Sequence, residues 1–199
     1  MPVFLKDVKR ELQSDLGRVG KNPDGSFKFI PPSIVGRRLR DYSQLRVSKI
    51  TKSASPSRDM LTFTALVSSE NTKGIKYKVT IEFHNLKFKD LKSAQFSEEV
   101  KTGRGRGAKK MYHRVPTVQR NPVKLKCQCK DFQHRFEFPL DKVDGLIGAP
   151  TPYTRKTDPW NRRGTGGRPS VNSTEKVGIC KHINSVLEVL KDQGMIKER

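Results

Sequence analysis

All three cysteines of this chain lie in two short motifs, a C-x-C at 127–129 and a C-x-H at 180–182, with 50 residues between them. Side chains two positions apart on a strand leave the same face, so Cys127 and Cys129 can reach one ion. Cys180 and His182 come directly before an apolar stripe with helical spacing. Two ligands separated by one residue can converge there, before regular helical geometry begins. A fold that uses both motifs together must bring residues 127 and 180 close to each other.

Three thiolates and one imidazole form a standard ligand set for structural zinc, with Zn–S distances of about 2.3 Å and Zn–N distances of about 2.0–2.1 Å. Thiolates are soft ligands and favour Zn²⁺ over Mg²⁺ or Ca²⁺. Lysines beside the motifs (Lys126, Lys130 and Lys181) would help to keep the thiols ionised. The alternative is three free cysteines buried in a core, which is common. Zinc is favoured because every cysteine lies within two residues of another cysteine or a histidine.

The spacing C-x-C…C-x-H resembles the SWIM zinc finger, a ββα module with these four ligand types. The resemblance covers residues 120–193 approximately, and it implies that the metal ligands are Cys127, Cys129, Cys180 and His182. The separation of the two motifs exceeds the usual spacing in that family. Residues 145–178 are therefore expected to form a long basic insert. SWIM modules are associated with DNA binding and with protein–protein contacts, so the resemblance does not choose between the two.

Six further residues accompany the ligands in a wider pattern, C-x-C-x-D-F-x-x-R-F followed by G-x-C-K-H. They are Asp131, Phe132, Arg135, Phe136, Gly178 and Lys181. This pattern resembles small SWIM-like proteins encoded among the structural genes of tailed bacteriophages. The resemblance implies a component of the virion, for example in the neck, tail or baseplate.

Period-two alternation of apolar residues predicts strands over 60–68 and 75–83, joined by a turn. We expect an antiparallel sheet over residues 40–90 with one wet face, to which Lys76, Lys78 and Glu82 point. Alternation returns at 123–129. The aromatic residues at 132, 136 and 138 then fall in the opposite parity, which predicts a bulge or tight turn near 130–131, just after the C-x-C motif.

Helical periodicity is present near both ends of the chain, at 5–16 and at 183–190, and Gly194 is a candidate C-cap. The predicted fold class is α+β, a small antiparallel β-sheet with terminal helices and a zinc-stapled ββα C-terminal module. The expected domains are 1–100, the N-terminal helix plus antiparallel sheet; 101–119, a basic flexible linker; and 120–199, the SWIM-like zinc module.

Lysine and arginine total 41 against 20 aspartate and glutamate, a formal net charge of +21. Such a charge attracts polyanions. Residues 101–130 contain ten of these cations and no acid. Within them we expect a polyanion- or partner-binding set of Lys101, Arg104, Arg106, Lys109, Lys110 and Arg114. We also expect His113 to be solvent-exposed.

Catalysis is not expected, since a four-ligand zinc site has no open position and no H-E-x-x-H, Walker A or G-x-S-x-G motif occurs. No apolar run is long enough for a membrane span, and the N-terminal residues lack a signal-peptide core. The favoured hypothesis is a non-enzymatic, zinc-stabilised virion component made in the host cytoplasm, with protein subunits as partners and no small-molecule substrate. The alternative is a cytoplasmic nucleic-acid-binding zinc-finger protein that uses residues 101–130.

Overall fold

The structure is a computed structural model that describes residues 2–8, 18–21, 27–30, 45–70, 72–102, 108–151 and 177–199. The described strands are β1 (Arg18–Lys21), β2 (Phe27–Ile30), β3 (Val47–Ser55), β4 (Met60–Ser68), β5 (Lys76–Phe83), β6 (Phe88–Lys89), β7 (Glu98–Thr102), β8 (Lys109–His113) and β9 (Val123–Cys127). Besides the helical residues 5–8, the described helices are the 3-10 turn η2 (Pro56–Arg58) and the α-helices α3 (Lys130–Arg135), α4 (Glu137–Lys142) and α5 (Lys181–Asp192). Antiparallel sheets with a C-terminal helix confirm the α+β prediction.

The central element is a four-stranded antiparallel sheet in the order β3-β4-β5-β9. Its inner face is apolar because alternate residues of β4 (Leu61, Phe63, Ala65 and Val67) are fully buried. Val79 on β5 lies opposite Ala65 and also opposite Cys127. The expected sheet over 40–90 is therefore present, and β9 extends it. The strand that carries the first cysteine motif thus shares a sheet with residues 47–83.

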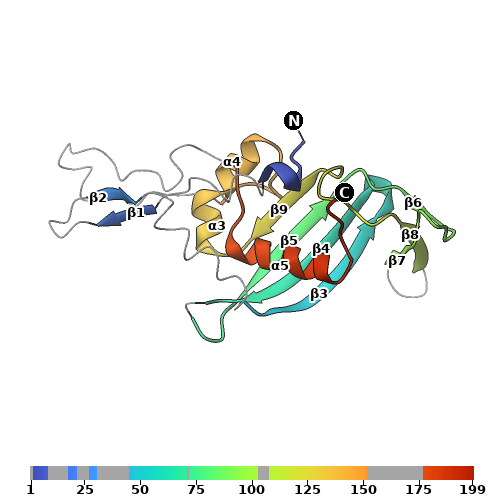
Figure 1. Cartoon of the computed structure of the whole chain (residues 1–199), viewed down its shortest axis with the longest axis horizontal. Helices are drawn as coiled ribbons and strands as arrows, with labels where there is room; N and C mark the ends of the chain where they lie inside the picture. The colour runs from blue at the N-terminus through green and yellow to red at the C-terminus, as the bar shows by residue number, and fades with distance from the viewer. Residues whose placement is uncertain are drawn as a thin grey trace.

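Helix α5 covers the inner face of this sheet (Figure 1). The predicted stripe is confirmed, since Ile183, Val186, Leu187 and Leu190 are all buried. Each such side chain contributes about 1.5–3 kcal/mol when fully removed from water. Gly194 follows the helix with a φ of 68° and donates its backbone N–H to the Lys191 carbonyl. A left-handed residue is a common helix end, as expected for this glycine.

Backbone from two other segments covers the free edge of β9. Val123 donates its N–H to the Val3 carbonyl at 2.8 Å, and Leu125 exchanges hydrogen bonds with Gly145 and Ile147. Leu5 and Val8 lie in a helical segment that begins at residue 5 and are fully buried. The later part of the helix expected over 5–16 lies outside the described residues. These contacts satisfy an edge strand that would otherwise expose unpaired backbone groups.

Residues 130–142 form helices α3 and α4, so the expected return to a strand after residue 131 was wrong. The chain leaves β9 at Cys127 and enters α3 at Lys130. The backbone N–H of Phe132 donates to Cys129 Sγ at 3.3 Å, and Cys129 is thereby the N-cap of α3. Phe132 and Phe136 are buried four residues apart, which is a helical spacing, whereas Phe138 is 54% exposed. A spacing of four fits both a strand and a helix, and the cap decides for the helix.

A small sheet in the order β6-β8-β7 lies at one end of the main sheet (Figure 1). His113 on β8 is buried, so the prediction of a solvent-exposed side chain was wrong. Its ring packs against Phe88, and its Nδ1 lies 2.7 Å from the Arg114 carbonyl. Burial is the main cause that lowers the pKa of His113, although the hydrogen bond to Arg114 opposes it.

The two-stranded sheet β1-β2 pairs Arg18 with Ile30 and Lys21 with Phe27. In the part of the chain that the structure describes, none of the helices is both long and apolar enough for a transmembrane span.

Candidate metal centre

The two motifs meet where β9 ends and two helices begin. Cys127 is the last residue of β9, Cys129 caps α3, Cys180 caps α5, and His182 lies in the first turn of α5. Residues 127 and 180 are brought together because β9 and α5 pack against each other across the inner face of the sheet. The positive ends of helix dipoles favour thiolates at such positions.

The four side chains form one buried cluster. Their ligand atoms all lie within 4.8 Å of one another. Cys127 is fully buried, and Cys129, Cys180 and His182 are between 2% and 4% exposed. Three sulfurs and one imidazole nitrogen at these separations could hold a metal ion.

His182 provides a test of whether a metal fits. Both of its ring nitrogens are buried, and neither has a hydrogen-bond partner among the described residues. The ring packs against Tyr77 of β5, with centroids 4.8 Å apart. A buried polar group without a partner costs about 1–3 kcal/mol. A metal ion on one nitrogen would remove that cost, so the chemistry of this side chain fits a ligand role.

Hydrogen bonds and burial shift the pKa values of the three thiols in different directions. Hydrogen bonds from the Cys127 and Cys180 thiols, in that order of importance, lower the pKa of Cys129. The same hydrogen bond with Cys129 raises the pKa of Cys127, and burial raises the pKa of Cys180. A divalent cation would favour the ionised form of all three thiols, because metal binding displaces their protons.

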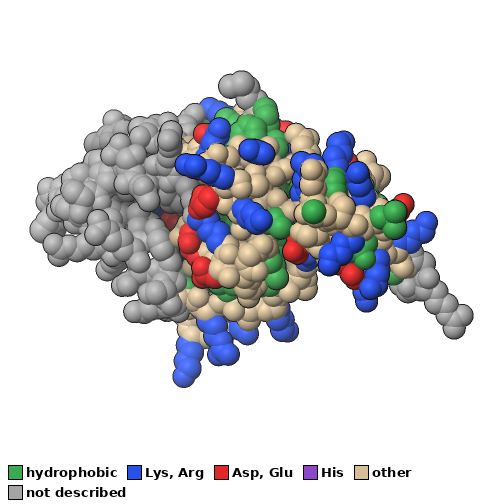
Figure 2. Space-filling model, turned by 45° about the vertical axis from the view of Figure 1, so that its right-hand side comes forward, with side chains coloured by type: hydrophobic (Ala, Val, Ile, Leu, Met, Phe, Trp, Pro, Cys, Tyr) green, Lys and Arg blue, Asp and Glu red, His purple; other side chains and the backbone are tan. Residues whose placement is uncertain are grey.

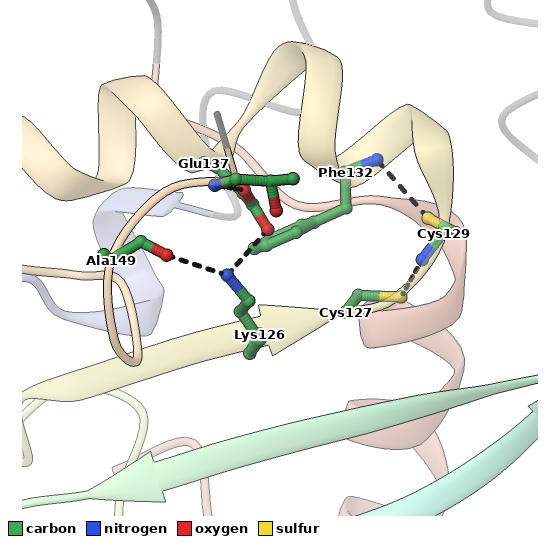
Figure 3. Close-up of polar contacts among 7 residues, drawn as sticks. Lys126, Cys127, Cys129, Phe132, Glu137 and Ala149 are labelled. Carbon is green, nitrogen blue, oxygen red and sulfur yellow. Dashed lines mark hydrogen bonds and ion pairs between the residues drawn. The ribbon is translucent and has the colours of Figure 1, made fainter. Parts of the chain in front are cut away.

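Backbone contacts hold the C-x-C turn in place. Cys129 donates its N–H toward Cys127 Sγ at 3.5 Å (Figure 3). Gln128, between the two cysteines, donates its N–H to the Lys78 carbonyl at 3.2 Å and accepts the Lys78 N–H on its side-chain oxygen at 3.1 Å. The turn is thus anchored on β5, the strand that also carries Tyr77.

Two of the three lysines expected beside the thiolates, Lys126 and Lys181, have acidic partners. Lys126 Nζ lies 2.8 Å from Glu137 Oε1 and donates to the Ala149 carbonyl at 3.2 Å (Figure 3). Lys181 forms an ion pair with Glu70. Glu137 is almost fully buried and also accepts the Thr151 N–H at 2.6 Å. These contacts fix the segments that flank the cluster.

The residues of the wider C-x-C-x-D-F-x-x-R-F and G-x-C-K-H pattern have structural roles around the cluster. Arg135 Nε lies 2.9 Å from Asp131 Oδ1 one turn along α3. Phe132 and Phe136 pack together with ring centroids 6.3 Å apart. Gly178 lies so close to Phe136 that a Cβ on the glycine would come within 2.7 Å of the ring. The ring therefore positions the chain that enters Cys180.

We expect Gly178→Ala to destabilise the fold by about 1–3 kcal/mol, because overpacking forces side chains or backbone to move. The affected chain leads into Cys180, so metal affinity should fall as well. Thermal unfolding and metal titration measure the two effects.

The control is Gly178→Ala combined with Phe136→Leu, which removes the atoms that clash. If the clash of the added methyl group with the ring causes the loss, Gly178→Ala should reduce stability and metal affinity less in the Phe136→Leu background than in the unmodified chain. Equal losses in both backgrounds would contradict this explanation.

The expected polyanion- or partner-binding residues do not join the cluster. Lys101, Lys109 and Lys110 are exposed on β7 and β8, and Arg114 follows β8. Lys110 pairs with Glu99 at 3.2 Å, and Arg114 packs over the Phe96 ring. Arg104 and Arg106 lie outside the described residues, as does most of the expected insert at 145–178.

Two residues of the centre were missed from the sequence. Tyr77 lies in the strand predicted over 75–83, in the same alternation as the buried residues Val79 and Ile81. This position was the sequence signal that it would face the inner side of the sheet. Glu137 was not considered, since an isolated glutamate gives no local indication that it is buried.

Comparison of the chain with models of protein families, with curated proteins and with solved structures finds no match.

Proposed function

We propose that this protein is a non-enzymatic structural component of a larger assembly and that zinc bound by Cys127, Cys129, Cys180 and His182 stabilises it. The observation that carries the proposal is the burial of all four ligand atoms in one cluster. A complete set of four protein ligands leaves no position for substrate or water, which is typical of structural zinc. Zinc, when bound, would tie β9, α3 and α5 together.

The proposed assembly is the virion of a tailed phage, in the neck, tail or baseplate, after synthesis in the host cytoplasm. Its support is the sequence pattern that surrounds the ligands. The net charge of +21, to which the Lys and Arg side chains on the surface in Figure 2 contribute, also favours a chain that is bound to other molecules, because the like charges of an isolated chain repel one another. Neighbouring protein subunits are the proposed partners.

The alternative function is nucleic-acid binding through residues 101–130. It is favoured by the exposure of Lys101 and Lys109. Against it, Glu98 and Glu99 lie on β7 and pair with Lys52 and Lys110. The positive electrostatic potential around this segment is therefore weaker than its sequence suggests.

Fractionation of assembled particles tests the main proposal. The chain should remain with gradient-purified particles at about 1 M salt, where contacts made only to phosphates are strongly weakened. Recovery of the chain only as free protein, or its release by nuclease at low salt, would overturn the structural role and favour the alternative.

A further inference from the structure

A group of cations lies on the outer face of the main sheet, opposite α5, near the turn between β4 and β5. Arg46, the residue before β3, lies opposite Ser68 of β4, and Ser68 pairs with Lys76 of β5, so the three residues form one row. In the next row, Ser48 pairs with Leu66, and Leu66 with Lys78. Neighbouring strands are about 4.8 Å apart. We call this surface, with Lys49 and Lys73 beside it, the basic face.

All five cations of the basic face are exposed. Among the described residues, none of them has an acidic partner. The acids nearest along the chain to Lys73, Lys76 and Lys78 have other partners: Glu70 pairs with Lys181, and Glu82 lies 3.4 Å from His84. The charge of this surface is therefore uncompensated within the described part of the chain.

The composition of the basic face decides which partner fits it. Protein interfaces usually have an apolar, aromatic-rich centre. Here the two rows contain Arg46, Ser68 and Lys76, then Ser48, Leu66 and Lys78. Lysine, arginine and serine are the side chains that contact phosphate groups of nucleic acids. The surface therefore complements a phosphate backbone better than an acidic protein.

The metal centre lies on the other side of the same strand. Tyr77 packs on His182, while its neighbours Lys76 and Lys78 point to the outer face. The backbone of Lys78 is held by Gln128 of the C-x-C turn. The strand that carries two of the cations is thus fixed by the metal-binding turn.

We propose that the basic face binds the phosphate backbone of double-stranded nucleic acid. This site is distinct from the segment 101–114 and does not depend on the assembly role. The contacts are electrostatic, so binding is independent of base sequence and weakens steeply with salt.

The test compares two triple variants that remove the same charge. The first is Lys73→Ala, Lys76→Ala and Lys78→Ala. The control is Lys101→Ala, Lys109→Ala and Lys110→Ala on the β7-β8 surface. The probe is a duplex DNA of about 30 base pairs, with affinity measured as a function of salt concentration. Each phosphate contact contributes about 0.9 to the log–log salt slope.

We expect the slope to shrink by about 2–3 in the basic-face variant and by less than about 1 in the control. Metal content and melting temperature should not change in either variant, because the substituted side chains are exposed. Equal shrinkage in both variants, or shrinkage only in the control, would overturn the proposal. So would a basic-face variant that keeps its duplex affinity but no longer binds poly-glutamate, since the partner would then be an acidic protein.

Discussion

Replacement of Cys180 by serine is expected to abolish stoichiometric metal binding and to lower the melting temperature by roughly 10–20 °C. Loss of a structural metal is among the few single changes that cost about 5 kcal/mol. For a chain of 150–250 residues, 1 kcal/mol shifts the melting temperature by about 2–4 °C. The effect should be large because Cys180 caps α5, the helix that covers the main sheet. Elemental analysis and thermal unfolding under reducing conditions measure it.

A chelator provides the matched control for this substitution. It should lower the melting temperature of the unmodified chain to that of Cys180→Ser and leave the variant unchanged. His134→Gln changes an exposed histidine on α3 that lies outside the cluster, so it should keep the metal and respond to chelator as the unmodified chain does. If the unmodified chain holds no stoichiometric metal, or if chelator has no effect on it, the three cysteines are free core residues and the metal proposal is wrong.

Lys126→Met is expected to destabilise the fold by about 2–3 kcal/mol. Breaking a buried ion pair costs about 3–5 kcal/mol because one charge is left without its partner in the interior. Glu137 is 1% exposed, but the Lys126 side chain is 28% exposed, so the cost should lie at or below the lower end of that range. The remaining partner of Glu137 would be the Thr151 N–H. Denaturant unfolding measures the loss.

The double variant Lys126→Met with Glu137→Gln distinguishes an unpaired charge from lost packing. It should be more stable than Lys126→Met alone, since the glutamine is neutral and can still accept the hydrogen bond from Thr151. Lys124→Met is the surface control: its partner Asp144 is 74% exposed, and exposed pairs contribute about 0–1 kcal/mol. A double variant that is no more stable than Lys126→Met would show that the buried charge is not the cause.

Alternation and helical spacing were sufficient to predict the elements whose pattern is regular. The buried positions of β4 and β5 follow every second residue, and those of α5 follow the apolar stripe. These patterns show which face of a strand or helix is buried, because the spacing of apolar residues within the element sets that face. The segment 130–142 was assigned wrongly because Phe132 and Phe136 satisfy both periods. The hydrogen bond from the Phe132 N–H to Cys129 Sγ favours the helix, and it forms only where the tertiary structure places that sulfur at the start of α3.

The sequence by itself determined the four metal-ligand candidates, since residue type and spacing are local properties. Only the tertiary structure placed Cys127 and Cys180 in one cluster, because β9 first had to pair with β5 and α5 had to pack on both. The same holds for the burial of His113 and Glu137 and for the rows of the basic face. Each depends on contacts between residues far apart in the chain, and strand register, which sets those contacts, is determined by the packing of the whole sheet.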